Sequence, residues 1–93
     1  MQSFDQRLRE LTRAAQNGDA LTFGHLGHNL KGAAASFNAQ PLTQVALEIE
    51  TKGAAGDLST APLLLAALAA EMKRLREFLL ERSIIKSETA SAN

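Results

Sequence analysis

The feature that most constrains the fold of this chain is an apolar repeat at helical spacing in its C-terminal half. Leu64, Leu68, Met72, Leu75 and Leu79 recur every three or four residues, and this spacing puts their side chains on one face of an α-helix. The rest of the chain is rich in Leu, Ala, Glu, Arg and Gln, which favour helices. Its β-branched residues never alternate with polar ones over the length of a strand. We therefore predict an all-α fold.

Capping and helix-breaking residues divide the sequence into separate predicted helices. These span about residues 3–16, 20–37, 41–53 and 60–85. Ser3 and Asp19 are good N-caps for the first two helices, and Asn38 tolerates the left-handed conformation that ends a helix. Because the connections are short, we predict one domain over residues 1–85, an antiparallel up-down four-helix bundle. We predict a disordered tail over residues 86–93, because this small and polar segment buries too little apolar surface to order itself.

Composition and charge exclude several classes of function. The 93 residues carry 10 Lys and Arg against 10 Asp and Glu, so no net charge draws the chain toward nucleic acid or an anionic membrane surface. The absence of cysteine excludes disulfides and thiolate chemistry and is compatible with the cytoplasm. No apolar run approaches the ~20 residues that span a bilayer. We therefore expect a cytoplasmic protein that binds neither nucleic acid nor a membrane.

The second predicted helix carries the residues that suggest a function. Drawn as a wheel with about 100° per residue, it gathers an apolar face for the core: Phe23, Leu26, Leu30, Ala33, Ala34 and Phe37. His28 falls near the opposite pole and is predicted to face water. Lys31 lies on the adjoining edge, where its ammonium group could reach an anion attached to the imidazole.

Small and apolar residues surround this histidine in the sequence. A glycine inside a helix costs roughly 0.8–1.0 kcal/mol relative to alanine, and Gly24, Gly27 and Gly32 each incur that cost. We interpret these glycines as clearing access to the imidazole of His28. The other histidine of the helix lies about 60° from His28 on the wheel, still exposed. The predicted contact surface for a partner consists of Leu21, Gly24, His25 and Ala35.

Several chemistries are disfavoured around His28. No serine or cysteine lies where the imidazole could activate it as a nucleophile. His25 and His28 have the spacing of a metal-binding pair, but no carboxylate or cysteine within a turn completes a ligand set, so we predict no metal site. No glycine-rich phosphate loop follows a strand, and we do not expect the chain to bind and cleave ATP itself. Any phosphoryl group on His28 must therefore come from another protein.

The stretch HNLKGAAASFNAQPL, residues 28–42, resembles the H-x-L-K-G signature of histidine phosphotransfer (HPt) domains. The resemblance extends to NGDA before this helix and to LEIE in the next one. It implies a carrier in a two-component phosphorelay, which accepts a phosphoryl group from a receiver-domain aspartate and passes it to another. His28 then matches the phosphorylated histidine, Lys31 the lysine and Gly32 the glycine beside the site. Asn38 stands where the family usually has glycine, and the turn should survive because asparagine tolerates the left-handed conformation.

The resemblance also implies partners and cofactors. Receiver domains of response regulators are the expected partners, with Mg²⁺ on the receiver, and this chain is expected to hold no cofactor of its own. We expect a monomer that is either free-standing or one domain of a hybrid sensor kinase. Two alternatives stay open: the dimerisation and histidine-bearing helices of a sensor kinase, and a non-catalytic adaptor bundle. The kinase alternative expects an acidic residue after the histidine and a proline soon after, whereas Asn29 follows His28 and Pro41 lies thirteen residues away.

Overall fold

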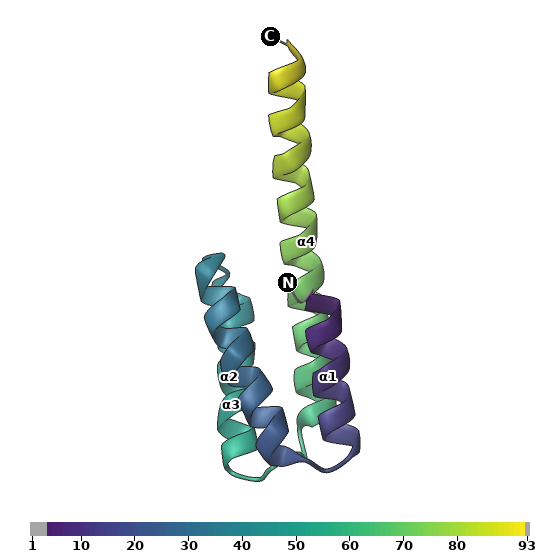
Figure 1. The fold of residues 1–93 in the computed structure, drawn as a ribbon, viewed down its shortest axis with the longest axis vertical. Coiled ribbons are helices and arrows are strands. Elements are labelled where there is room, and N and C mark those ends of the chain that lie inside the picture. Colours follow the sequence, from purple (N-terminus) through teal and green to yellow (C-terminus); the bar gives the residue numbers. More distant parts are fainter. Residues whose placement is uncertain (1–3, 93) are drawn as a thin grey trace.

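The computed structural model describes the backbone of residues 4–92 and the side chains of residues 5–81. It contains four helices: α1 (Phe4–Gln16), α2 (Ala20–Ser36), α3 (Gln40–Ala54) and α4 (Ala61–Ala92) (Figure 1). Residues 4–92 include no strand. The predicted all-α fold is therefore confirmed. The predicted cap of the first helix, Ser3, lies outside the described residues.

Helices that follow one another in the chain are also neighbours in space. α2 and α3 have the most extensive contact, and Figure 1 shows them side by side along their length. α4 packs on both α3 and α1 and continues well beyond the other three helices (Figure 1). The turns after α1 and after α3 lie at the same end of the molecule (Figure 1). No helix in the described part of the chain is both long and apolar enough to cross a membrane.

Both ends of α2 are held by residues that the sequence predicted. The Asp19 side chain accepts a hydrogen bond from the backbone N–H of Thr22 at 3.1 Å, and this bond satisfies one of the free amides of the first turn. Asn38 has a left-handed backbone, with φ of 58°. The N–H of Ala39 donates to the carbonyl of Ala34 at 3.1 Å, as in a Schellman motif. The helix that carries His28 is thus fixed by local hydrogen bonds at both ends.

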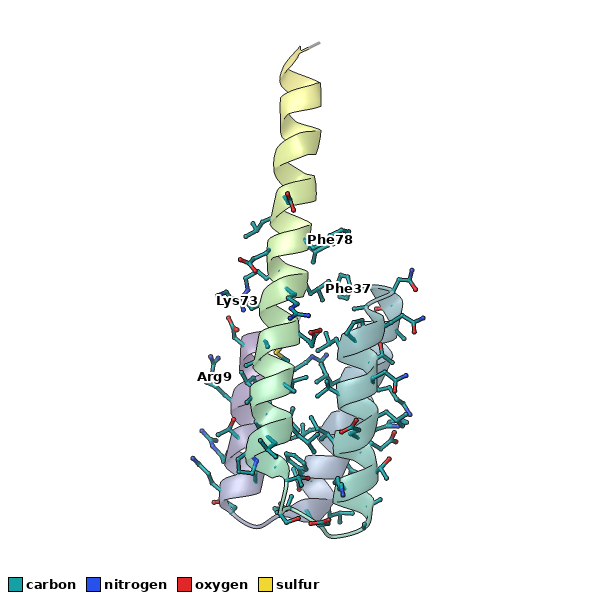
Figure 2. All side chains as sticks on the ribbon, turned by 180° about the vertical axis from the view of Figure 1, so that it is seen from behind. Arg9, Phe37, Lys73 and Phe78 are labelled. Carbon is teal, nitrogen blue, oxygen red and sulfur yellow. The ribbon has the colours of Figure 1, made fainter. Side chains whose placement is uncertain are left out.

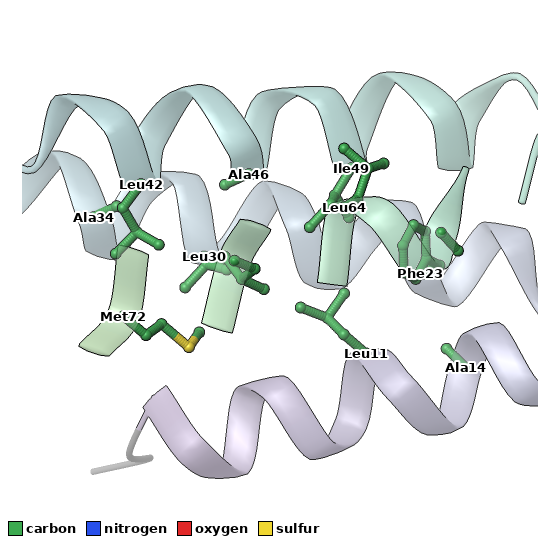
Figure 3. Close-up of a cluster of buried hydrophobic side chains, with 12 residues drawn as sticks. Leu11, Ala14, Phe23, Leu30, Ala34, Leu42, Ala46, Ile49, Leu64 and Met72 are labelled. Atoms are coloured by element: carbon green, nitrogen blue, oxygen red, sulfur yellow. The ribbon is translucent and has the colours of Figure 1, made fainter. Parts of the chain in front are cut away.

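Every helix contributes side chains to one apolar core. Leu11 of α1, Phe23 of α2 and Leu68 of α4 are completely buried, and so is Ile49 of α3. Burial of such side chains is the main favourable term in folding. Among the described side chains, no polar or charged one is buried with them. The core consists of Leu11, Ala14, Phe23, Leu30, Ala34, Leu42, Ala46, Ile49, Ala61, Leu64, Leu68 and Met72 (Figure 3).

Two residues that the sequence predicted in the core are instead substantially exposed. Phe37 keeps 47% of its surface exposed, because α2 ends at Ser36 and the helical wheel does not extend to the next residue. Leu79 keeps 40% exposed; it follows Phe78, which lies where α4 extends past the other helices (Figure 2). Figure 2 shows Phe37 and Phe78 near the level at which α4 leaves the bundle. The buried seam of α4 therefore ends about one turn earlier than its apolar repeat.

The backbone of α4 continues to Ala92, and its side chains are described as far as residue 81. The domain boundary at residue 85 and the disordered tail over residues 86–93 stay predictions.

Candidate functional site

His28 lies on the outward side of α2, as predicted. Its side chain keeps 63% of its surface exposed, while Phe23 and Leu30 on the same helix are completely buried. The ring is therefore presented to solvent by a helix whose other face is fixed in the core.

A carboxylate from the neighbouring helix contacts the ring. Glu50 of α3 has one carboxylate oxygen, Oε2, 2.6 Å from Nδ1 of His28. Its other oxygen, Oε1, accepts a hydrogen bond from Nζ of Lys31 at 2.7 Å. Glu50 thus joins the two residues of α2 that the sequence singled out for phosphoryl chemistry.

The electrostatics of this contact determine which ring nitrogen carries a proton. The hydrogen bond from Lys31 lowers the pKa of the Glu50 carboxyl, and the hydrogen bond with His28 lowers it further. An ionised carboxylate only accepts hydrogen bonds. Nδ1 of His28 must therefore be the donor, and in the neutral ring the lone pair lies on the other nitrogen, Nε2. The arrangement provides an exposed imidazole with one nitrogen held and the other available as a nucleophile.

Glu50 was not among the site residues predicted from the sequence. One signal for it was present, because Glu50 follows Ile49 in the apolar stripe of the third helix and so belongs at the edge of the buried face. The missing information was that α3 packs against the side of α2 next to His28 and Lys31. The ammonium group of Lys31 contacts Glu50, and its predicted reach to an anion attached to the ring stays a prediction.

The glycines near His28 have two different environments. Gly32 is exposed, and a Cβ atom built on it would meet nothing within 4 Å. Ala35 is exposed as well. These two positions fit the predicted open approach to the ring.

The other two glycines of the helix have a different environment. Gly24 and Gly27 are buried against α3. A Cβ atom on Gly24 would lie 3.1 Å from Cα of Gly53, and one on Gly27 would lie 2.8 Å from the backbone nitrogen of Glu50. Their absent side chains allow the two helices to approach each other closely.

A shallow hollow of about 290 Å³ lies beside the ring. Leu21, which is 66% exposed, forms part of its rim, as predicted for a docking residue. His25 is exposed and also lines the hollow. The lining consists of Leu21, Gly24, His25, His28, Glu50 and Ala54. Within the described residues, no three His, Cys, Asp or Glu side chains gather as a metal-ligand set.

Comparison with known proteins gives the family of the chain. Comparisons with curated proteins and with solved structures found no match. A protein-family model described as the Hpt domain matches residues 1–78. The matched range contains His28, Lys31, Glu50 and the whole lining of the hollow. The resemblance seen in the sequence is therefore confirmed, and the chain belongs to the Hpt domain family.

Proposed function

We propose that this domain accepts a phosphoryl group from a receiver-domain aspartate on Nε2 of His28 and passes it to the aspartate of another receiver. Membership of the Hpt family supports a histidine phosphotransfer role in phosphorelays. To this family role the proposal adds the phosphorylated residue, the ring nitrogen that carries the phosphoryl group, and receiver domains as the partners. The observation that carries it is the 2.6 Å contact between His28 Nδ1 and Glu50 on an otherwise exposed ring.

The transfer step is a substitution at phosphorus. The lone pair on Nε2 attacks, the N–P bond forms, and the P–O bond to the aspartyl carboxylate breaks with its electron pair leaving on oxygen. The ring then carries positive charge, because Nδ1 retains its proton. Glu50, already hydrogen-bonded to that nitrogen, stabilises this charge as it develops. Reversal of the same step returns the phosphoryl group to a carboxylate.

The remaining residues of the site contribute position and access. Lys31 donates a hydrogen bond to Glu50 in the free domain. Once His28 is phosphorylated, the ammonium group of Lys31 turns partly toward the phosphoryl oxygens and offsets their charge. Gly32 and Ala35 leave the surface after His28 open for the loops of a receiver. We propose Leu21 and His25 as the rim on which the receiver docks, because both border the hollow beside the ring. The Mg²⁺ that assists such transfers belongs to the receiver in this proposal, and this chain needs no cofactor of its own.

Three further features belong to the same proposal. We propose an antiparallel up-down bundle, supported by the neighbour relations of successive helices and by the two turns at one end of the molecule (Figure 1). We also propose a monomer, because the apolar stripes of all the helices meet in one core. A cytoplasmic location agrees with receiver domains as partners.

A direct test is incubation of the purified domain with a receiver that carries radiolabelled aspartyl phosphate. The proposal expects label on the domain that is labile in acid and stable in base, as a phosphoramidate is, and loss of that label in His28→Gln. A non-catalytic adaptor would bind the receiver and acquire no label. Sedimentation of the unlabelled domain tests the monomer, and a tight dimer would favour the kinase-helix alternative.

A further inference from the structure

Glycines make a close approach between α2 and α3 about one helical turn from His28 and Glu50. A Cβ atom on Gly53 of α3 would lie 2.3 Å from Cα and 2.4 Å from the nitrogen of Gly24 on α2. Both atoms belong to the backbone, so a small rotation of a side chain could not relieve the overlap. Any side chain at Gly53 therefore requires the two helices to separate or shift.

A second glycine makes a similar contact next to the site itself. Gly27 precedes His28, and a Cβ atom on it would lie 2.7 Å from Cγ2 of Ile49 and 2.8 Å from the backbone nitrogen of Glu50. The backbone that carries the histidine thus touches the backbone that carries its carboxylate partner. Gly24 makes a milder contact, with the nearest atom at 3.1 Å from its built Cβ.

The hydrogen bonds of Glu50 depend on this spacing. Both of them cross from α3 to α2, to His28 at 2.6 Å and to Lys31 at 2.7 Å. Hydrogen bonds from N–H to oxygen have heavy-atom distances of about 2.7–3.2 Å, and a contact of about 3.6 Å no longer counts as one. With the side chains as they lie, a separation of the two backbones by about one ångström would take both of these contacts beyond that range.

We propose that Gly24, Gly27 and Gly53 are positioning residues, which set the distance between α2 and α3 at which Glu50 bridges His28 and Lys31. The proposal deepens the proposed function and rests on it, because the bridge matters for phosphoryl acceptance at Nε2. These glycines thus have a different role from Gly32, since a Cβ atom built on Gly32 would meet nothing within 4 Å.

The test compares single Gly→Ala variants of the full chain in the unphosphorylated state. Gly24→Ala, Gly27→Ala and Gly53→Ala introduce the same methyl group at contacts of 3.1, 2.7 and 2.3 Å. Gly32→Ala is the matched control, because it adds the same methyl group to α2 at a position where the group meets open space. Circular dichroism establishes which variants are folded. NMR then follows the ¹³C signal of the Glu50 carboxyl through a pH titration, together with the nuclear Overhauser contact between Glu50 and the His28 ring.

We expect the lowered pKa of Glu50 to return toward its ordinary value in the contact variants, and the contact with the His28 ring to weaken in parallel. Among the variants that fold, the shift in the pKa of Glu50 should increase from Gly24→Ala to Gly27→Ala to Gly53→Ala. Gly32→Ala should keep the wild-type pKa of Glu50. A loss of stability alone would not move this pKa in a variant that remains folded, so the titration separates positioning from general packing.

The proposal is contradicted if no folded contact variant shifts the pKa of Glu50 more than Gly32→Ala does, or if all three contact variants are unfolded. Because the titration uses the unphosphorylated domain, it does not depend on whether a receiver transfers its phosphoryl group. Failure of the wild-type chain to accept a phosphoryl group would contradict the proposed function and leave the titration result standing.

Discussion

Nδ1 of His28 lies 2.6 Å from Oε2 of Glu50, although the two residues are 22 positions apart in the chain. The same carboxylate holds Lys31 through its other oxygen at 2.7 Å. Residues of two helices therefore share one ionised carboxylate. This carboxylate fixes the proton on Nδ1, so that the lone pair of the neutral ring lies on Nε2, the nitrogen that we propose as the nucleophile.

Removal of the carboxylate should slow phosphoryl acceptance without unfolding the domain. In Glu50→Ala, nothing fixes the proton on Nδ1 or stabilises the charged ring. We expect acceptance from a phosphorylated receiver to slow by roughly 10- to 100-fold, the scale of one hydrogen bond to a charged group. The rate of acceptance by Glu50→Gln should lie between the rates of this variant and the wild type, because the amide oxygen still accepts a hydrogen bond from Nδ1. The control is Glu48→Ala, an exposed carboxylate two residues earlier on α3. Equal rates for Glu50→Ala and Glu48→Ala would remove Glu50 from the mechanism.

Lys31 is expected to act on the phosphoryl group and not only through Glu50. Lys31→Ala should slow acceptance or shorten the lifetime of the phosphorylated domain, with circular dichroism unchanged. A double-mutant cycle with Glu50→Ala separates the two routes. If Lys31→Ala has a further effect in the Glu50→Ala background, the ammonium group acts on the phosphoryl oxygens directly. If it has none there, its role is confined to holding Glu50.

Leu68 and Leu30 should each contribute strongly to stability. Both are completely buried in the core, and Leu→Ala substitutions at such positions cost about 2–5 kcal/mol through lost burial and the cavity that remains. Leu63→Ala is the matched control on α4, because Leu63 is 73% exposed and its loss should change the free energy of unfolding by no more than about 0.5 kcal/mol. Urea denaturation measures the free energy of unfolding of each variant. A small effect at Leu68 or Leu30 would mean that the helices are rotated relative to the core described above.

The cap of α2 should make stability depend on pH in the acid range. The hydrogen bond with Thr22 lowers the pKa of Asp19 below its ordinary value of 3.8. A carboxyl group with a lowered pKa in the folded state stabilises the fold above its ordinary pKa, and this contribution is lost as the pH falls through the lowered value. Asp19→Asn keeps a side chain that caps well but does not titrate. The wild type should therefore lose stability relative to Asp19→Asn as the pH falls below 3.8, measured as the difference in Tm. A constant difference across this range would contradict the role given to Asp19.

The sequence predicted those features that depend on residues close together in the chain. The bounds of α2 follow from Asp19 and Asn38, which act on their own helix. The exposure of His28 follows from the helical period, because Phe23 and Leu30 fix the opposite face in the core. Such features need no knowledge of how the helices are placed in space.

The features that the sequence did not predict depend on contacts between helices. Glu50 belongs to the site because α3 packs beside His28, and this packing cannot be derived from either helix alone. Gly24 was interpreted as opening the surface, although the backbone of Gly53 occupies the space next to it. Leu79 continues an apolar repeat beyond the point where other helices cover α4. A helical wheel describes one helix at a time and contains no information on any of these contacts.

The most direct test of the central claim compares His28→Gln with His25→Gln in phosphoryl acceptance from a labelled receiver. The two histidines lie on the same helix and are both exposed, but only His28 is hydrogen-bonded to Glu50. Neither substitution removes a core contact, so helicity and Tm should stay near those of the wild type. We predict that His28→Gln accepts no label and that His25→Gln accepts label with at most a modest loss of rate. Label that persists in His28→Gln and disappears in His25→Gln would contradict the assignment of the site.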